Sequence, residues 1–578
     1  MSSDEYLRAS SAWSRAAPGL TALQALVPSS WLQIAAIASI HLVALGLLWW
    51  TEYELVHFAL FILAWLLFNC VWLVLLRRPG LSAALSLFLV AAIIAISKFK
   101  FGITWWTITF LDFLIVEPDT ALFLLSVFPQ LRLTLLIVAI VLVPLLIVIW
   151  RIDPFKVRRR TSALGAAACL FSLTGLSLAV PEQPWEPFQG VNHVSNFVRS
   201  GITGVSELFT HGWLEADAPG SAGHLPVGAA DACQRAGKRP HIVMVLDESS
   251  FDVTAARDIR VPPDYRRHFR SFDGKQRSFI VDATGGPTWY AEYSVLTGLS
   301  PRSFGRFMFY VTRLAAGHVE RGLPQALRRC GYKTFSLYPD AGDFLSARHF
   351  QRTAGIEHFF DARDMGAADI EPDSFYFDQT LRTITRERGG APLFIFTYVT
   401  ANHFPWDTRF HPELTPGWKG LGNEASVDEY IRRQMMSARD YGDFIARLKR
   451  EFPDEPFLVV RFGDHQPWIS SRFLEPELDE AAVARKVMEY DPRYFTTYYA
   501  IDAVNFQPPD MSSALETIEA PYLPLVIQEA AGLPLDATFA EQKKIMQRCN
   551  GLFYRCGGGA EARRFNRLLI DAGLIKGL

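Results

Sequence analysis

The sequence predicts a helical membrane domain with five spans, followed by an α/β sandwich with a largely parallel central sheet. Two observations support this combination: long apolar segments gather in the first third of the chain, and short apolar runs alternate with helical stretches in the rest. At 578 residues the chain is long enough for more than one domain. We therefore expect a transmembrane domain over residues 1–180, an amphipathic junction and linker over 181–235, and the α/β domain over 236–578.

Five apolar segments in the first third each approach the ~20 residues that a helix needs to cross a bilayer. A cleavable signal peptide is the alternative for the first segment, but 30 residues precede it and further spans follow. The five segments are Trp31–Trp50, Leu55–Leu76, Leu81–Ser97, Leu133–Trp150 and Ala163–Val180.

The loop Lys98–Arg132 is aromatic and apolar, but acidic residues and a proline interrupt it. Its apolar pieces are too short to span, so we expect an interfacial segment with Trp105 and Trp106 at the level of the lipid head groups. A sixth span is the alternative for this loop, since interrupted apolar runs are ambiguous.

Basic residues predict the orientation of the chain in the membrane. With five spans, three basic clusters all fall on one side, and the positive-inside rule makes that side the cytoplasm. The N-terminus is then cytoplasmic and everything after Val180 is periplasmic or extracellular, as in a multi-pass protein of a bacterial inner (plasma) membrane. The clusters are Arg8 with Arg15, Arg77 with Arg78, and Arg151 with Lys156 and Arg158–Arg160.

The junction begins rich in proline and continues as an amphipathic stretch before the linker-like segment Gly220–Ala230. One interpretation is a helix that lies along the membrane surface, and the other is a helix that packs within the protein. The first interpretation would turn Trp185, Phe188, Phe197 and Phe209 towards lipid.

The cysteines of the second domain and the net charge of the chain indicate which bonds and partners to expect. Its four cysteines are an even number in a region predicted to be exported, so disulfides are expected. Cys549 and Cys556 are close enough for a local bridge, which would leave Cys233 with Cys330, although spacing alone does not determine the pairing. A cysteine metal site is disfavoured because no Cys-x-x-Cys occurs. The formal net charge of -2 gives no indication of a nucleic-acid partner.

Two short apolar runs in the second domain end directly in polar motifs. His241–Leu246 leads into Asp247-Glu248-Ser249-Ser250, and Phe457–Phe462 leads into Gly463-Asp464-His465. Such runs are typical of central strands in a parallel sheet, whose ligands bind outside the carboxyl ends of the strands. Two carboxylates and an imidazole brought to this edge could share one metal ion.

Further strand candidates also end in polar residues, and helical candidates lie between them, as an α/β sandwich requires. The strand candidates are Ser278–Val281, Thr334–Leu337 and Pro392–Val399, and the helical ones are Gly322–Cys330, Val427–Phe452 and Leu478–Tyr490. The residues that follow the three strands are Thr284 and Thr288 in a Gly-rich loop, then Tyr338 and Asp340, then Asn402-His403-Phe404-Pro405-Trp406.

Four motifs in order carry a family resemblance: Glu248 after a strand, a loop threonine before Leu296–Pro301, Asn402–Trp406, and Gly463–His465. Together they resemble the alkaline-phosphatase/sulfatase superfamily. Within it they are most similar to the membrane-anchored phosphoglycerol transferases of the lipoteichoic acid synthase type, with the phosphoethanolamine transferases next. The resemblance extends from the first span to about Phe506 and implies a sulfatase-like domain outside the membrane.

The resemblance implies roles for individual residues. One divalent metal would be held by Glu248, Thr288, Asp464 and His465, with Thr288 also the nucleophile. His403 would face the substrate. Where the family typically has another histidine, this chain has Tyr338 or Asp340 as a candidate substrate-binding residue, and Leu345 stands where an aromatic residue is expected. Trp406 could stack on a head group or belong to the core, and Asp247, in place of a frequent glycine, could add a carboxylate near the metal.

The chemistry explains these residue types. A threonine hydroxyl is a poor nucleophile unless a metal lowers its pKa, and the same metal can offset charge on a phosphoryl group. Two carboxylates and one imidazole suit Mn²⁺ or Zn²⁺, with Mg²⁺ possible. The implied reaction is ping-pong: Thr288 takes a phosphoglycerol group from the membrane phospholipid phosphatidylglycerol, and a hydroxyl of a cell-envelope glycan or glycolipid then takes it from the phosphothreonine.

Plainer interpretations stand beside these. Glu248 could cap a following helix, Asp464 and His465 could form a simple turn, and Thr284 competes with Thr288, whereas Thr297 has the context of a structural residue. The alternative functions are a phosphoethanolamine transferase acting on lipid A or a glycan, a hydrolytic sulfatase, and a non-enzymatic lipid sensor. The sulfatase is disfavoured because the loop lacks the Cys/Ser-x-Pro-x-Arg sequence that makes formylglycine.

Overall fold

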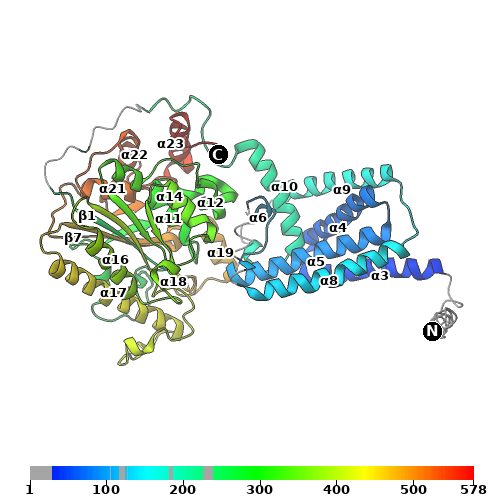
Figure 1. Cartoon of the computed structure of the whole chain (residues 1–578), viewed down its shortest axis with the longest axis horizontal. Coiled ribbons are helices and arrows are strands. Elements are labelled where there is room, and N and C mark those ends of the chain that lie inside the picture. The colour runs from blue at the N-terminus through cyan, green and yellow to red at the C-terminus, as the bar shows by residue number, and fades with distance from the viewer. Residues whose placement is uncertain are drawn as a thin grey trace, which may run out of the picture. The chain divides into compact units, whose positions relative to one another are not determined.

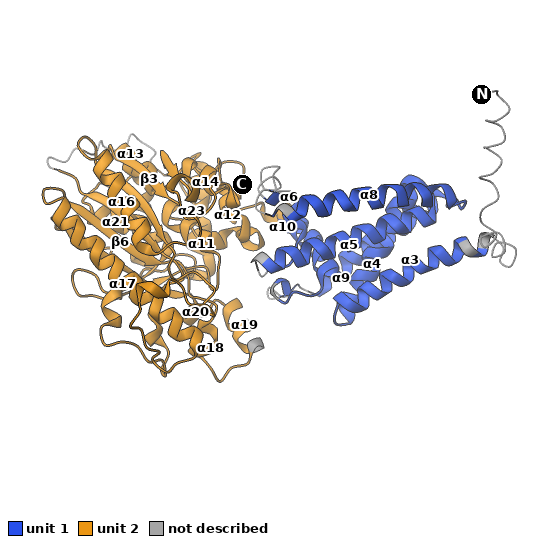
Figure 2. Cartoon of the chain, turned by 60° about the horizontal axis from the view of Figure 1, so that its bottom comes forward, with its two compact units in different colours: residues 1–116, 124–207 blue, residues 117–123, 208–578 orange. Residues whose placement is uncertain are grey.

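The structure is a computed structural model that describes residues 29–104, 106–115, 124–125, 128–180, 182, 186–225, 233 and 238–578 (Figure 1). The chain divides into two compact units (Figure 2). Unit 1 contains residues 1–116 and 124–207, and unit 2 contains residues 117–123 and 208–578. The boundary at residue 207 falls within the segment 181–235 that the sequence marks as a junction.

Unit 1 is helical. Within the described residues, five of its helices are long and apolar enough to cross a membrane, which confirms the five predicted spans. The third helix begins earlier and ends later than predicted, since its flanking residues continue the helical turns. The five helices are α3 (Ser29–Thr51), α4 (Leu55–Leu76), α5 (Pro79–Thr104), α8 (Pro129–Ile152) and α9 (Arg159–Ala179).

The aromatic loop between α5 and α8 contains one short described helix, α6 (Phe110–Ile115). With six residues it is far too short to span a bilayer. Asp112 at its start forms an ion pair with Lys100 of α5 at 2.8 Å, which holds the loop against unit 1. Trp105 and residues 116–123 lie outside the described residues, so the interfacial location of this loop stays a prediction.

The junction forms the helix α10 (His193–His211). Phe197 packs against Phe110 and Phe113, with ring centroids 5.8 and 5.4 Å apart, as expected for the packing interpretation. Arg199 on the same helix is buried and forms an ion pair with Glu186 at 2.9 Å. Phe209, beyond the boundary of unit 1, is 87% exposed. The side chains of Trp185 and Phe188 lie outside the described residues.

Unit 2 is built on an eight-stranded sheet in the order β4-β3-β5-β1-β6-β7-β2-β8. β7 is antiparallel to both of its neighbours, and every other neighbouring pair is parallel, which confirms a largely parallel α/β sandwich. The strands are β1 (His241–Asp247), β2 (Arg277–Ile280), β3 (Lys333–Leu337), β4 (His358–Phe360), β5 (Leu393–Val399), β6 (Phe457–Gly463), β7 (Thr496–Val504) and β8 (Thr517–Glu519).

Helices cover both faces of the sheet, and side chains of β1 alternate between them. On one face Val243 and Val245 share a core with α16 (Asp373–Glu387) and α17 (Ala425–Glu451). Figure 1 shows α11 and α21 on the other side of the sheet. These are helices of residues Thr288–Thr297 and Leu523–Ala530. Residues that follow one another at the end of β1 therefore face different layers.

Both predicted disulfides are present in unit 2. Cys549 is bonded to Cys556, and Cys233 is bonded to Cys330. The first bridge closes a loop of the C-terminal segment, and the second ties the chain ahead of β1 to the end of α13 (Leu323–Arg329). Disulfides persist in oxidising compartments, so the pairing fits a domain outside the cytoplasm.

Candidate metal centre

Glu248, Asp464 and His465 converge at the carboxyl edge of the sheet. One ligand atom from each lies within 4.8 Å of the other two, and all three side chains are buried. They converge because β1 and β6 are adjacent parallel strands that end at the same level, with Asp247 opposite Gly463. A Cβ atom at Gly463 would overlap the carbonyl oxygen of Ser250, so the two strand ends can approach this closely only with glycine there.

Two atoms of this cluster have no hydrogen-bond partner in the part of the chain that the structure describes: Asp464 Oδ2 and His465 Nε2. They lie 3.4 Å apart. A buried polar atom without a partner is destabilising unless something binds it. His465 Nδ1 donates to the carbonyl oxygen of Gln466 at 2.9 Å, so Nε2, which lies 3.3 Å from Glu248 Oε1, is the ring nitrogen that would bind a metal once its proton is displaced.

The backbone holds the second carboxylate oxygen of Asp464. Asp464 Oδ1 accepts hydrogen bonds from the amides of Ser249 and His465, both at 2.8 Å. Ser249 has a positive φ of 51°, and its carbonyl oxygen accepts a hydrogen bond from the Tyr430 hydroxyl at 2.5 Å. This unusual backbone at Ser249 thus aims its amide at a candidate metal ligand.

The charges of the cluster are strongly coupled. Burial opposes the charge of Glu248, but the His465 imidazole outweighs it and lowers the pKa of Glu248 to about 2. Burial and the Glu248 carboxylate raise the pKa of Asp464 to about 8. Burial also opposes the charge of His465, yet the two carboxylates raise its pKa to about 9. The metal-free cluster therefore retains protons that a divalent cation would displace.

Thr288 lies at the start of α11, and its hydroxyl donates to Glu248 Oε2 at 3.0 Å. Ahead of it, Gly285 has a φ of 76°, and its amide donates to the carbonyl oxygen of Gln466 at 2.9 Å. The threonine loop is thus tied to the loop that carries His465. The N-terminus of a helix favours negative charge, which suits a phosphoryl group at this position.

The competing threonines lie in other environments. The Thr297 hydroxyl donates to the carbonyl oxygen of Tyr293 at 2.7 Å and accepts from the amide of Leu299, a structural role at the end of α11. Thr284 forms a backbone bridge with Gln466, and within the described residues its hydroxyl makes no hydrogen bond to the ligand cluster. The geometry therefore favours Thr288 as the hydroxyl that joins the carboxylates.

Oxygen and nitrogen ligands of this kind fit a divalent transition metal. Two carboxylates, one imidazole and a hydroxyl match the ligand preferences of Zn²⁺ and Mn²⁺. Asp464 Oδ2 and His465 Nε2, which have no hydrogen-bond partner among the described residues, are the atoms that such a metal would bind. The interpretation of Glu248 as a helix cap does not fit the structure. No helix begins at Glu248, because the next helical turn, Val253–Ala255, is capped by Asp252.

His403 lies beside this cluster but outside the three-residue ligand group. It is half-buried, its Nδ1 donates to the carbonyl oxygen of Phe404 at 2.7 Å, and its ring stacks on the Phe404 ring with centroids 4.5 Å apart. After burial and His465, His403 is the next group that acts on the pKa of Glu248, which it lowers. Because Nδ1 is engaged with the Phe404 carbonyl oxygen, Nε2 is the ring nitrogen of His403 that makes no hydrogen bond within the described residues.

The remaining predicted substrate residues differ in accessibility. Tyr338 is buried against Phe359 and Tyr398, and burial, reinforced by nearby carboxylates, raises its pKa. Asp340 is exposed, and its carboxylate accepts from the amide of Ala341. Trp406 is 4% exposed, belongs to a core cluster and donates to the carbonyl oxygen of Asn402 at 2.9 Å. These contacts support the core interpretation of Trp406.

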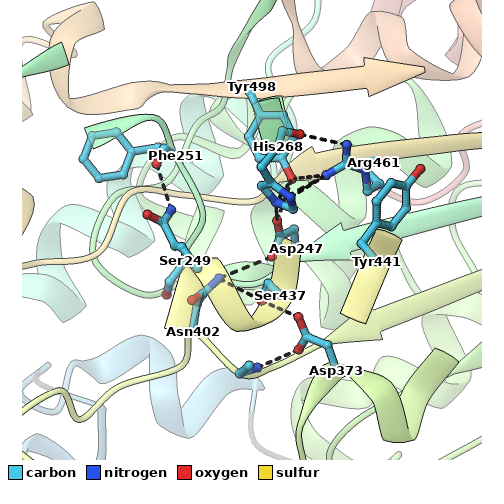
Figure 3. Close-up of polar contacts among 12 residues, drawn as sticks. Asp247, Ser249, Phe251, His268, Asp373, Asn402, Ser437, Tyr441, Arg461 and Tyr498 are labelled. Carbon is cyan, nitrogen blue, oxygen red and sulfur yellow. Dashed lines mark hydrogen bonds and ion pairs between the residues drawn. The ribbon is translucent and has the colours of Figure 1, made fainter. Parts of the chain in front are cut away.

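Asp247 does not face the metal cluster, so the prediction of an additional carboxylate there is wrong. The reason is strand alternation: Glu248 faces the layer of α11, and Asp247 faces the opposite layer. Its carboxylate accepts from His268 Nε2 at 3.0 Å and from the Tyr498 hydroxyl at 2.5 Å (Figure 3). Arg461 of β6 lies behind His268 and donates to its carbonyl oxygen at 2.8 Å.

This anchor network, formed by Asp247, His268, Arg461 and Tyr498, was not found from the sequence. Figure 3 shows that it continues through Asn402, whose amide donates to Asp247 and to the Ser437 hydroxyl. One signal was available, because Arg461 interrupts an otherwise apolar central strand and a buried arginine requires partners. Ser249 acts through its backbone amide and Gln466 through its carbonyl oxygen, so the sequence contains no signal for either role.

Comparisons with known proteins agree with this fold. Residues 240–493 match the family model described as Sulfatase. A putative cyclic beta-1,2-glucan modification protein of Rhizobium meliloti is 22% identical over 251 residues, 42% of this chain and 38% of the relative. The chain spans less than half the length of the curated relatives it matches.

The chain is also similar to solved structures, among them two with TM-scores below 0.5. The phosphoglycerol transferase GacH of Streptococcus pyogenes, in complex with sn-glycerol-1-phosphate, has 16% identity and a TM-score of 0.45, covering 59% of this chain and 87% of that one. The periplasmic EptC domain of Escherichia coli, in complex with zinc, has 14% identity and a TM-score of 0.36, covering 52% and 84%.

The family match and the folded site agree on the class of this domain. Residues 240–493 match the Sulfatase family model and fold as a sulfatase-like α/β domain, in a chain whose first third contains five helices long and apolar enough to cross a membrane. Within this domain the buried cluster of Glu248, Asp464 and His465 is a candidate metal site.

Proposed function

We propose that the chain is a metal-dependent phosphotransferase that moves a phosphoglycerol group from phosphatidylglycerol to a cell-envelope glycan or glycolipid. The observation that carries this proposal is the hydrogen bond between the Thr288 hydroxyl and Glu248, inside a cluster that also contains Asp464 and His465. A nucleophile beside three potential ligands at a helix N-terminus is suited to phosphoryl transfer.

Glu248, Thr288, Asp464 and His465 hold the metal in this proposal. When bound, a divalent cation lowers the pKa of the threonine hydroxyl and offsets negative charge on the phosphoryl oxygens. Mn²⁺ or Zn²⁺ suits this donor set best, and Mg²⁺ remains possible.

Glu248 orients the nucleophile, and His403 moves the protons of the lipid and acceptor oxygens. Thr288 Oγ1, whose hydroxyl donates to Glu248 at 3.0 Å, loses its proton to solvent and attacks phosphorus. The bond from phosphorus to the diacylglycerol oxygen breaks, and His403 protonates that oxygen. An acceptor hydroxyl then attacks the phosphothreonine, His403 removes the proton of that hydroxyl, and Thr288 Oγ1 leaves phosphorus and takes up a proton from solvent.

The donor and the orientation follow from the membrane domain. Five apolar helices attach the sulfatase-like domain to a bilayer, where phospholipid head groups are the abundant phosphodiesters. We propose a cytoplasmic N-terminus and a periplasmic or extracellular catalytic domain, in agreement with the basic clusters and the two disulfides. The similarity to a putative cyclic beta-1,2-glucan modification protein of Rhizobium meliloti supports a glycan acceptor.

Mass spectrometry of the trapped adduct tests this function. The purified full-length chain is incubated with phosphatidylglycerol without acceptor, quenched and digested. The expected result is a glycerophosphoryl group on the peptide that contains Thr288, absent from Thr288→Ala. An ethanolamine-containing adduct from a phosphatidylethanolamine donor would instead establish the second candidate, a phosphoethanolamine transferase. No adduct with either donor would overturn the transferase function.

Two other functions receive less support from the site. A sulfatase of the formylglycine type needs a cysteine or serine motif that the Thr288 loop lacks. A lipid sensor on this fold has no need for the metal ligands, whereas Glu248, Asp464 and His465 converge here with Thr288 beside them. A Thr288→Ala strain that keeps the cellular phenotype would favour the sensor.

A further inference from the structure

Large apolar side chains that are exposed are rare on unit 2. Among its described residues they are Phe209, Phe272, Phe404 and Trp468. Two of these four lie on loops of the candidate site: Phe404, 38% exposed, follows His403, and Trp468, 44% exposed, follows His465 by three residues. Exposed aromatic residues gathered at a functional edge indicate a contact with a ligand or a membrane.

The position of Trp468 is defined by the two other site loops. Its Cα and Cβ lie against Gly285, on the loop that presents Thr288. Its ring lies beside Trp406, with centroids 6.4 Å apart, and Trp406 belongs to the same loop as Phe404. Phe404 and Trp468 thus mark the outer border of the loops that surround the nucleophile, and we name this pair the aromatic rim.

We propose that the aromatic rim contacts the bilayer surface and the apolar part of the phospholipid donor while its phosphate reaches Thr288. This inference rests on the proposed function, in which the donor is a membrane lipid. Aromatic side chains prefer the boundary between head groups and acyl chains, and the donor's leaving group, diacylglycerol, is itself apolar. The spans of unit 1 make a bilayer an obligatory neighbour of this chain.

The contacts of the rim favour lipid over a stacked sugar. The guanidinium of Arg472 lies over the Trp468 ring at 4.4 Å, and the His403 ring covers one face of Phe404. A sugar needs a free aromatic face, whereas insertion into lipid needs only an exposed ring edge. Arg472 is 55% exposed and forms an ion pair with the exposed carboxylate of Glu424 at 3.6 Å, so its charge beside the rim is partly offset.

A comparison of two donors tests the rim. The double variant Phe404→Ser and Trp468→Ser, reconstituted as the full chain, is assayed with phosphatidylglycerol in the same vesicles and with monomeric dihexanoyl-phosphatidylglycerol in solution. We expect the rate with the vesicle donor to fall by at least about tenfold, because each ring loses its apolar contact, while the rate with the soluble donor stays within about twofold.

Phe272→Ser is the matched control. Phe272 is 46% exposed, and its amide donates to the carbonyl oxygen of Ile501, which lies opposite Val460 in the middle of β6, so Phe272 belongs to none of the loops of the site. This variant should match wild type with both donors. The conservative pair Phe404→Leu and Trp468→Phe should restore most of the vesicle rate, which a lost fold would not allow.

Each other outcome overturns the inference. An unchanged vesicle rate would mean that the rim does not contact lipid, and equal losses with both donors would place these residues in the head-group site. A loss that depends on the glycan acceptor, with normal hydrolysis of either donor, would assign the rim to sugar binding. If wild type uses neither donor, the proposed function itself fails, and that result is distinct from all of these.

Discussion

Replacement of Asp247 by alanine should make the domain less stable. Asp247 is not a candidate metal ligand, unlike its neighbour Glu248, so we expect this effect to come from the anchor network and not from the metal site. Asp247 is 2% exposed and accepts from His268 at 3.0 Å and Tyr498 at 2.5 Å. Burial opposes its charge, but His268 and Tyr498 outweigh burial and lower its pKa, so it is ionised in the folded protein. The carboxylate also faces the buried cation Arg461.

The expected loss of stability follows from the buried donors and the buried charge that the substitution leaves without a partner. Each buried donor left without an acceptor costs about 1–3 kcal/mol, and breaking a buried charge arrangement costs about 3–5 kcal/mol. We expect Asp247→Ala to lower the free energy of unfolding by about 3–5 kcal/mol, a large part of the ~5–15 kcal/mol of a typical domain. At about 2–4 °C per kcal/mol, the melting temperature should fall by roughly 6–20 °C.

Thermal unfolding of the full chain in detergent, followed by circular dichroism, measures this change. Thr288→Ala is the matched comparison, since its half-buried hydroxyl contributes only about 0.5–1.5 kcal/mol through its bond to Glu248. That variant should lose transfer and keep its melting temperature within a few degrees. An Asp247→Ala protein that melts with wild type would refute the anchoring role of this carboxylate.

Three further predictions concern the metal, the pH dependence and the topology. Chelation should abolish transfer and Mn²⁺ or Zn²⁺ should restore it, with metal at ~100 times its Kd adding about 2.7 kcal/mol to stability; full activity in chelator would contradict the metal site. Asp373 lies at the start of α16, where burial and the Asp247 carboxylate raise its pKa to about 8. In the unfolded chain the pKa of an aspartate is about 3.9, so between these two pH values the folded state binds a proton that the unfolded state has lost. The free energy of unfolding of wild type therefore falls as pH rises through this range. Chemical denaturation at several pH values should therefore show that the free energy of unfolding of Asp373→Asn rises relative to that of wild type from pH ~5 to ~8. A difference between the two proteins that does not change with pH would contradict this. A reporter fused after Val180 should be active outside the cytoplasm, whereas cytoplasmic activity would break the five-span topology.

The fold could be predicted where apolar runs carry the information. The spans and the strands β1, β5 and β6 are mostly apolar, so their sequences and structures agree. β7 was missed because Thr496–Val504 mixes threonine, tyrosine and Asp502 with apolar residues, as suits a strand antiparallel to both neighbours. β4 and β8 are three residues each, too short for any periodicity.

The convergence of Glu248, Asp464 and His465 could be predicted because parallel strands bring their carboxyl ends together, whatever their separation in sequence. The direction of each side chain needed the structure. Strand alternation could have separated Asp247 from Glu248, but only once β1 was known to continue through Asp247. For Trp406, the sequence could not distinguish a ring that faces substrate from one that closes a core, because that depends on Tyr430 and the helix carrying it.

The close approach at Gly463 also bears on how such an enzyme can be altered. Main-chain packing between the two strand ends sets the spacing of Glu248 and Asp464, so the dimensions of the reaction centre belong to the scaffold. Residues 407–424, which follow β5, lie outside these strand ends, but buried Arg432 and Arg433 hold their carbonyl oxygens, and Trp418 and Leu421 pack against the core. A replacement segment would have to keep those contacts, whereas Gly463 accepts no side chain at all.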